Sequence, residues 1–262
     1  AGAVISLQGA TSVGRITDNL LSTSNNNADA VRFINSAADF LVARNNFGTT
    51  FGGALTGGSA VHLMTAGTYS GIKFSGNTMS AAPLNNAVLV AASIGSLSDL
   101  TVTDNTLVGR NSSLLLDIQS NPTNGMAVTG NHVRCAGNGS SAFLGASTIA
   151  VNSSTITGNR VTTCVNGILL GNGAGSADNV VSGNVIDNTG AAVAGQVGIS
   201  AYTRTSIVGN TIRGMQLGVR LNGSGNIVDG NSIDGTGAGI TLRCDPGGAA
   251  TDILGVCMTA SG

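Results

Sequence analysis

A short phrase with apolar residues at both ends and asparagine near its centre recurs along the whole chain. The phrase has the form apolar–x–(Gly or Asp)–Asn–x–apolar, as in the segments VTDNTL and VTGNHV. Successive asparagines are separated by 21 to 32 residues, a period typical of stacked repeats that are each too small to bury an apolar face alone. The asparagines of the nine copies are Asn19, Asn45, Asn77, Asn105, Asn131, Asn159, Asn184, Asn210 and Asn231.

The spacing within the phrase indicates a corner between two short strands. Apolar residues lie three positions before and two positions after the asparagine, which fits neither a helical stripe nor one unbroken strand. Gly or Asp followed by Asn adopts left-handed backbone angles at little cost. If the repeats stack in register, neighbouring asparagines lie about 4.8 Å apart and their amides can hydrogen-bond along the stack. We therefore predict an internal Asn ladder that satisfies polar groups otherwise buried at a cost.

A second apolar pattern runs in step with the first. Ten segments, from AVISLQ at Ala3 to GITLRC at Gly239, begin with a small residue and continue as an alternating or wholly apolar strand. Together with the strands that enter and leave each asparagine corner, they give roughly three strands per turn. The sequence predicts an all-β fold, a single-stranded parallel β-helix of about nine to ten coils over residues 1–244. Residues 245–262 leave the repeat, and we expect them to form a C-terminal flap or cap.

The repeated pattern G-I-x-L … I-x-G-N-x-I resembles the right-handed parallel β-helix repeats of the pectate-lyase-like superfamily. That superfamily includes carbohydrate-active enzymes, phage tailspikes and many bacterial surface proteins. The resemblance covers about residues 3 to 244 and implies a right-handed coil, which is also the common hand of parallel crossovers. The matched residues are those that build coils, so no catalytic motif of the family carries over to this sequence.

The composition narrows the possible partners. Hydrophobic residues make up 42% of the chain and aromatic residues 3%, so we expect a core of Val, Ile, Leu and Ala. Only 9% of the residues are charged and the net charge is −1, which argues against nucleic acid because phosphate binding needs a basic face. No apolar run reaches 18 residues, so we expect no membrane span.

The first predicted strand begins almost at the start of the chain and leaves little room for an N-terminal cap. An uncapped first coil would expose apolar strand edges and favour aggregation. We expect this end to be covered by a partner or by a further segment of a longer chain. The alternative is a cap formed by residues 1 and 2.

Three basic side chains fall close together if the coils stack in register. His132 and Arg134 follow one asparagine corner, and Arg160 follows the next. Such a cluster can bind an acidic sugar, and an arginine can act as the base of a lyase. The alternative is a solvated face, since the adjacent repeats lack the acids that metal binding would need.

Two acidic residues form a second candidate site. Asp187, Arg213 and Asp234 each lie three residues after their asparagine, so stacking predicts a column of alternating charge that helps to set the register. Asp187 and Asp234 would lie two steps apart, and inverting glycosidases use carboxylates roughly 6.5–9.5 Å apart. The structural interpretation is favoured because an arginine lies between the two acids.

The four cysteines suggest disulfides. Cys135 and Cys164 follow consecutive corners, at a spacing that suits a bridge. Cys244 and Cys257 bracket the segment after the last repeat, where a bridge would fix the flap. Buried free thiols are the alternative. Without CxxC or paired histidines we predict no metal and no cofactor.

Outward leucines on the second pattern indicate a contact with another subunit. Leu89, Leu115 and Leu169 would form an apolar strip on the outside of the rod, which should not face water. Either a neighbouring chain, with a homotrimer favoured, or a covering loop lies over the strip, or the assumed phase of these strands is wrong.

Two classes of function fit these patterns. The favoured one is a non-catalytic, structural or glycan-contacting domain of a larger extracellular or virion assembly, of the tail spike or fibre kind. The alternative, a polysaccharide lyase or glycoside hydrolase, is implied only by the resemblance. Sugar sites commonly offer aromatic platforms, and the sequence has only two tyrosines, Tyr69 and Tyr202.

Overall fold

The computed structural model of this chain describes most of the repeats. It covers residues 3–9, 11–22, 28–48, 58–64, 67–79, 86–90, 94–108, 114–118, 123–135, 142–146, 150–170, 175–188, 196–234 and 237–242. Within these ranges the chain forms β-strands joined by turns, with no helix. The predicted cap, residues 245–262, and the cysteines Cys244 and Cys257 lie outside the described residues.

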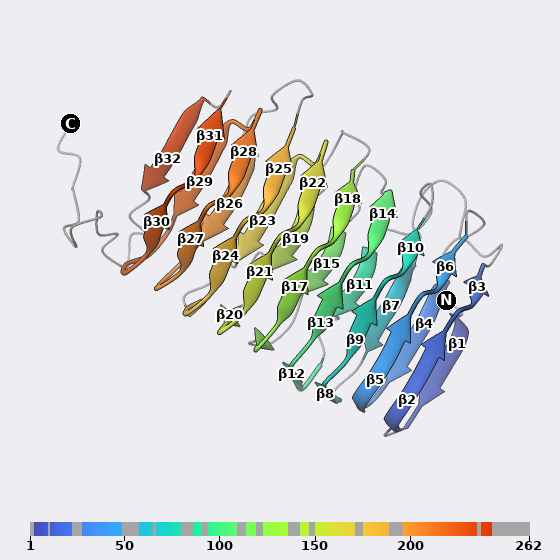
Figure 1. Cartoon of the computed structure of the whole chain (residues 1–262). Helices are drawn as coiled ribbons and strands as arrows, with labels where there is room; N and C mark the ends of the chain where they lie inside the picture. Colours follow the sequence, from blue (N-terminus) through green and yellow to red (C-terminus); the bar gives the residue numbers. More distant parts are fainter. Residues whose placement is uncertain are drawn as a thin grey trace.

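The strands stack into three parallel sheets that run along a rod (Figure 1). Sheet 1 has ten strands: β1 (Ala3–Gln8), β4 (Asp29–Ile34), β7 (Ser59–Met64), β11 (Asn86–Val90), β15 (Leu114–Ile118), β19 (Ala142–Ala146), β23 (Asn166–Leu170), β26 (Val197–Ala201), β29 (Leu217–Leu221) and β32 (Ala238–Leu242). Sheet 3 has nine: β3 (Leu20–Leu21), β6 (Asn46–Phe47), β10 (Thr78–Met79), β14 (Thr106–Val108), β18 (His132–Arg134), β22 (Arg160–Thr162), β25 (Val185–Asp187), β28 (Thr211–Arg213) and β31 (Ser232–Asp234).

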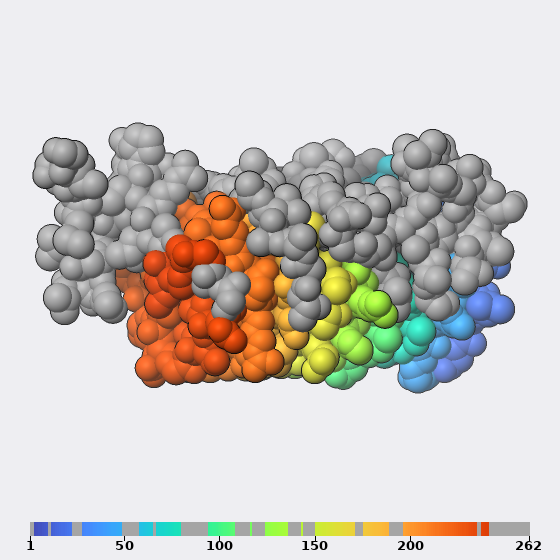
Figure 2. Space-filling model, turned by 90° about the horizontal axis from the view of Figure 1, so that it is seen from above, coloured from blue at the N-terminus to red at the C-terminus, as the bar shows by residue number. Residues whose placement is uncertain are grey.

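Sheet 2 has thirteen strands because most coils bend within it. Its strands are β2 (Thr11–Thr17), β5 (Ala37–Ala43), β8 (Thr68–Ser70), β9 (Lys73–Ser75), β12 (Ser96–Ser98), β13 (Thr101–Thr103), β16 (Thr123–Asn124), β17 (Ala127–Thr129), β20 (Val151–Asn152), β21 (Thr155–Thr157), β24 (Val180–Ser182), β27 (Ser206–Val208) and β30 (Ile227–Asp229). Each coil therefore passes through sheets 1, 2 and 3 in turn. Successive coils lie side by side along the rod, which Figure 2 shows from above. The predicted parallel β-helix of about nine to ten coils is confirmed.

Each coil turns the corner from sheet 2 to sheet 3 at a residue with a positive φ angle, directly before the ladder asparagine. This residue is Gly in six coils and Asp in two, with φ between 55° and 66°. Arg44 is the exception, with a φ of 53°, where a side chain costs roughly 1–2 kcal/mol. This backbone geometry explains why Gly or Asp usually stands directly before the asparagine of the repeated phrase.

The Asn ladder is confirmed along the whole rod. In every step the side-chain Nδ2 of one asparagine donates to Oδ1 of the next, over 2.9–3.2 Å. The same Oδ1 accepts the backbone N–H of the preceding asparagine, over 2.9–3.1 Å. Nδ2 also donates to a sheet 2 carbonyl of the preceding coil, over 2.8–3.0 Å. An interior amide therefore has all its donors and its acceptor engaged, so burial carries no desolvation penalty.

A shorter polar ladder occupies the bend inside sheet 2, and the sequence analysis missed it. The backbone N–H groups of Met126, Ser154 and Thr205 donate to the side chains of Ser154, Asn179 and Asn226, over 2.9–3.1 Å. The signal was available, because a small polar residue or Asn stands directly before these strands. The residue type at this position differs from coil to coil, so the sequence shows no clear repeat there.

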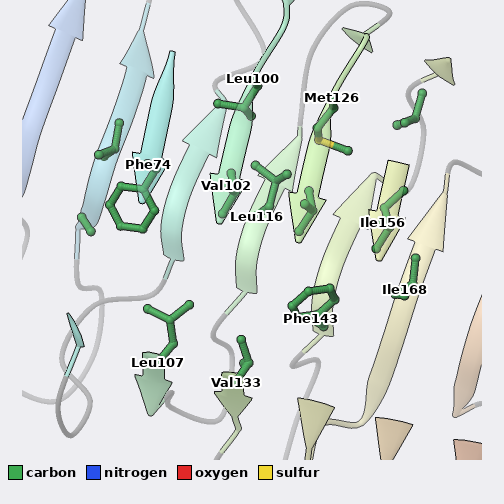
Figure 3. Packing of buried hydrophobic residues seen from close by; sticks show 14 of the residues in the cluster. Phe74, Leu100, Val102, Leu107, Leu116, Met126, Val133, Phe143, Ile156 and Ile168 are labelled. Carbon is green, nitrogen blue, oxygen red and sulfur yellow. The ribbon is translucent and has the colours of Figure 1, made fainter. Parts of the chain in front are cut away.

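The interior is a continuous apolar column between the sheets. One column of paired positions in sheet 2 runs through Phe74, Val102, Val128, Ile156, Val181 and Ile207, all with exposed fractions of 1% or less. Figure 3 shows Phe74 and Val102 with Leu107 and Val133 of sheet 3. Each residue of this column stacks on an apolar residue of the next coil, so the interior is filled mainly by β-branched side chains.

The register of sheet 1 shows which of the predicted outward leucines share a column. Leu89 of β11 pairs with Asp117 of β15, and Asp117 pairs with Gly145 of β19, which in turn pairs with Leu169. Leu115 lies two residues before Asp117 and belongs to another column. Leu116 is fully buried and pairs with Val88 and Leu144. Leu89 and Leu169 thus share one column and Leu115 belongs to a neighbouring one, and the contact of these leucines with another chain stays a prediction.

Cys135 and Cys164 form a disulfide, with their Cα atoms 4.8 Å apart. The two residues follow β18 and β22, and the Cys135 N–H donates to the carbonyl of Thr162 over 3.0 Å. The bridge closes a segment of 29 residues between adjacent coils. It fixes the two strands that carry the predicted basic cluster.

Candidate functional site

The outer face of sheet 3 brings His132, Arg134 and Arg160 together; we call these three residues the basic cluster. His132 and Arg160 are paired positions on adjacent strands, and Arg134 lies two residues further along β18. Val133 is buried in the core, so its neighbours on the strand point outward. All three basic side chains belong to exposed residues. The arrangement is a short, rigid row of hydrogen-bond donors facing solvent.

The predicted charge column lies on the same face. Asp187, Arg213 and Asp234 are paired positions on β25, β28 and β31. Arg134 heads this column, through the pairs of Thr162 with Arg134 and with Asp187. The charges share the register. The ion pairs found among the described residues involve other side chains and do not join Asp187, Arg213 or Asp234. Oδ1 of Asp187 is buried and has no hydrogen-bond partner among the described residues.

Two ion pairs brace the corners of neighbouring coils. Arg44 donates from Nε and Nη2 to Asp18, over 2.8 and 2.7 Å, and Arg204 donates in the same way to Asp178, over 2.8 and 2.9 Å. Hydrogen bonds from the arginines hold the pKa of both aspartates below the ordinary value. The side chains are 53–62% exposed, so each pair contributes little to stability.

A buried carboxylate on sheet 1 organises a cluster that the sequence analysis did not assign. Asp29 is 3% exposed. Its Oδ2 accepts from Nε and Nη2 of Arg32, over 2.8 and 2.7 Å, and from Nδ1 of His62 over 2.9 Å. Its Oδ1 accepts the backbone N–H of Ser59, over 2.8 Å. We call Asp29, Arg32 and His62 the Asp29 cluster.

The strand geometry explains this cluster. Asp29 and Arg32 lie on the same strand, and Arg32 pairs directly with His62 on the next coil. The column of Arg32 and His62 could be read from the sequence, but the inward turn of Asp29 could not. Burial would raise the pKa of Asp29, yet the hydrogen bonds from His62, Ser59 and Arg32 outweigh it and lower the pKa below its usual value. The carboxylate is therefore ionised at neutral pH.

Tyr69 is part of the core and not a platform for sugar. It is fully buried, and its hydroxyl donates to the backbone carbonyls of Met64 and, over 3.2 Å, of Phe33. Burial raises the pKa of Tyr69 to about 12. Of the two tyrosines, only Tyr202 is partly exposed.

The described residues hold no group of three or more His, Cys, Asp or Glu side chains that is arranged to bind a metal ion. In the same part of the chain, no helix is long and apolar enough to cross a membrane.

Comparison with known proteins finds likeness in structure and none in sequence. No protein-family model and no curated protein matches the chain. The crystal structure of DFA-IIIase from Arthrobacter chlorophenolicus A6 in complex with GF2 covers 90% of this chain and 69% of its own, with a TM-score of 0.50 and 16% identity. The Dettilon tailspike protein covers 88% of this chain and 54% of its own, with a TM-score of 0.35 and 15% identity. At such identities the likeness concerns the fold alone. The chain is a parallel β-helix protein.

Proposed function

We propose that this chain is a rigid, non-catalytic β-helical rod that contacts acidic glycans through the outer face of sheet 3. It does so within a larger extracellular or virion-surface assembly. The observation that carries the proposal is the basic cluster, in which two paired strands hold three exposed basic side chains in fixed register.

The chemistry of the basic cluster suits carboxylate or sulfate groups on a sugar chain. The guanidinium groups of Arg134 and Arg160 can each bind such a group with two parallel hydrogen bonds. The positions directly paired with the cluster on its flanks are Thr106, Val108 and Val185, so no acidic neighbour neutralises it there. The ladder and the disulfide fix the strands that carry the basic cluster. The backbone therefore loses little conformational entropy when a glycan binds.

The proposal is tested by measuring the affinity of a uronate polysaccharide, such as polygalacturonate, by calorimetry at low salt. Replacing both Arg134 and Arg160 by Ala should weaken binding at least about tenfold, since each charge-assisted hydrogen bond contributes roughly 1.5–3 kcal/mol. Added salt should weaken wild-type binding and leave the variant little changed.

A matched control comes from the corner ion pairs. Replacing both Arg44 and Arg204 by Ala also removes two exposed positive charges, each outside the basic cluster, and should leave the affinity unchanged. Equal losses in the two variants would mean that net charge alone governs binding. Equal binding of a neutral polysaccharide would also contradict the proposal.

One observation favours a second candidate function, a glycoside hydrolase. One carboxylate oxygen of Asp187 is buried and has no hydrogen-bond partner within the described part of the chain, and Asp234 lies two strands away in the same column. Two steps of about 4.8 Å place the acids near the upper limit for an inverting pair. Arg213 between them supports a structural role instead, so we rank this function second.

A further inference from the structure

His132 belongs to a residue type that titrates near neutral pH, unlike the two arginines of the basic cluster. A histidine side chain ordinarily gains its proton between about pH 8 and about pH 5, whereas arginine stays charged throughout. The chain has one other histidine, His62, which lies on sheet 1 with Nδ1 2.9 Å from Oδ2 of Asp29. On the outer face of sheet 3, a change of pH near neutrality therefore acts through His132.

Strand pairing puts His132 next to the two arginines. β18 lies between β14 and β22 (Figure 1), and His132 pairs with Thr106 on one side and with Arg160 on the other. Paired strands are separated by about 4.8 Å. Arg134 lies two residues further along β18, on the same outward face. Protonation of His132 thus turns the cluster into a compact group of three positive charges on two strands.

Two acids flank the cluster without pairing directly with His132. Asp104 stands over Gly130 at the corner that precedes β18. Asp187 pairs with Thr162, which in turn pairs with Arg134. The ion pairs found among the described residues do not include His132. An acidic ligand on the cluster can therefore supply the direct counter-charge.

We propose that His132 takes up a proton when an acidic glycan binds, so that the rod binds such glycans more tightly in mildly acidic surroundings. This inference rests on the proposed function of the basic cluster and adds its regulation by pH. Carboxylates bound by Arg134 and Arg160 lie beside His132, where an opposite charge favours the protonated ring, and that ring offers two N–H donors instead of one. The complex then holds more protons than its free components, so by linkage the affinity rises as the pH falls.

Calorimetry with polygalacturonate at low salt tests this coupling. The affinity should be about three- to fivefold higher at about pH 5.5 than at about pH 8, since an exposed charge pair contributes modestly. Titrations at about pH 6.5 in two buffers of different ionisation enthalpy should show that binding takes up a fraction of a proton. The fold should persist over this range, because the lowered pKa of Asp29 keeps its contribution to stability intact above about pH 4.

Three substitutions separate His132 from other effects of pH. With His132→Gln, the affinity should change less than about twofold over the same range, and proton uptake should vanish. His132→Lys should bind polygalacturonate tightly at both pH values, because lysine keeps its charge. His62→Gln is the control and should keep the pH dependence of the wild type.

The outcomes distinguish this inference from the proposed function on which it rests. Binding of polygalacturonate without proton uptake, or an unchanged pH dependence in His132→Gln, would overturn the inference and leave the proposed function standing. Absence of binding at both pH values would overturn both.

Discussion

Replacing Asn131 by Ala should lower the free energy of unfolding by about 3–5 kcal/mol. The change leaves the backbone N–H of Asn105 without its acceptor, over 3.0 Å, and removes one of the two acceptors of Asn105 Nδ2, over 2.9 Å. It also removes donors from the carbonyl of Val102 and from Oδ1 of Asn159. All of these groups lie in the interior, where an unsatisfied polar group carries its full desolvation cost. Urea unfolding followed by circular dichroism measures the loss.

The end of the ladder provides a control with the same change in side chain. Asn19 is exposed, and its Oδ1 accepts no hydrogen bond from a described residue. Asn19→Ala removes one rung contact to Asn45 and should cost about 1 kcal/mol or less. Equal losses for Asn131 and Asn19 would show that the ladder amides contribute through local turn geometry and not through buried hydrogen bonds.

Replacing Asp29 by Asn should cost about 2–4 kcal/mol at neutral pH. The buried carboxylate contacts both Arg32 and His62, and Asn presents an N–H group where the cluster needs an acceptor. Asp178→Asn serves as the matched control. It removes one charge from an Asp–Arg pair that is more than half exposed, and should leave stability almost unchanged because solvent screens the pair.

The pH dependence of stability gives Asp29 a second signature. Its pKa is lower in the folded chain than in the unfolded one, so its contribution is complete above the unfolded pKa of about 4. That contribution is lost as the pH falls through the folded pKa. The stability difference between wild type and Asp29→Asn should therefore shrink below about pH 4. A difference that stays constant down to pH 2 would contradict the assigned ionisation.

The sequence predicted the architecture well because the repeat is dictated by backbone chemistry. A residue that tolerates positive φ, followed by an asparagine, marks each corner, and alternation around Val133 or Val161 marks the faces. These local rules also brought His132, Arg134 and Arg160 together without reference to any structure. Such periodicity can be recognised in a single sequence because every coil needs the same corner and the same alternation of buried and exposed positions.

The sequence could not predict features that depend on register between dissimilar coils. Three consecutive leucines do not reveal which of them pairs with Leu89, and the pairing of Leu89 with Asp117 puts Leu115 in a neighbouring column. The Asp29 cluster was missed because an acid at the start of a strand ordinarily faces solvent. Here its burial follows from contacts with Arg32 and with a histidine from another coil, 33 residues away.

The most direct test of a binding rod is the size distribution of an acidic polysaccharide after prolonged incubation with the protein. Polygalacturonate is followed by size-exclusion chromatography with light scattering. We expect the polysaccharide to co-migrate with the protein and to keep its chain length. Shortening of the chains by wild type, abolished by Asp187→Asn, would contradict the account and assign the outer face of sheet 3 to a hydrolase.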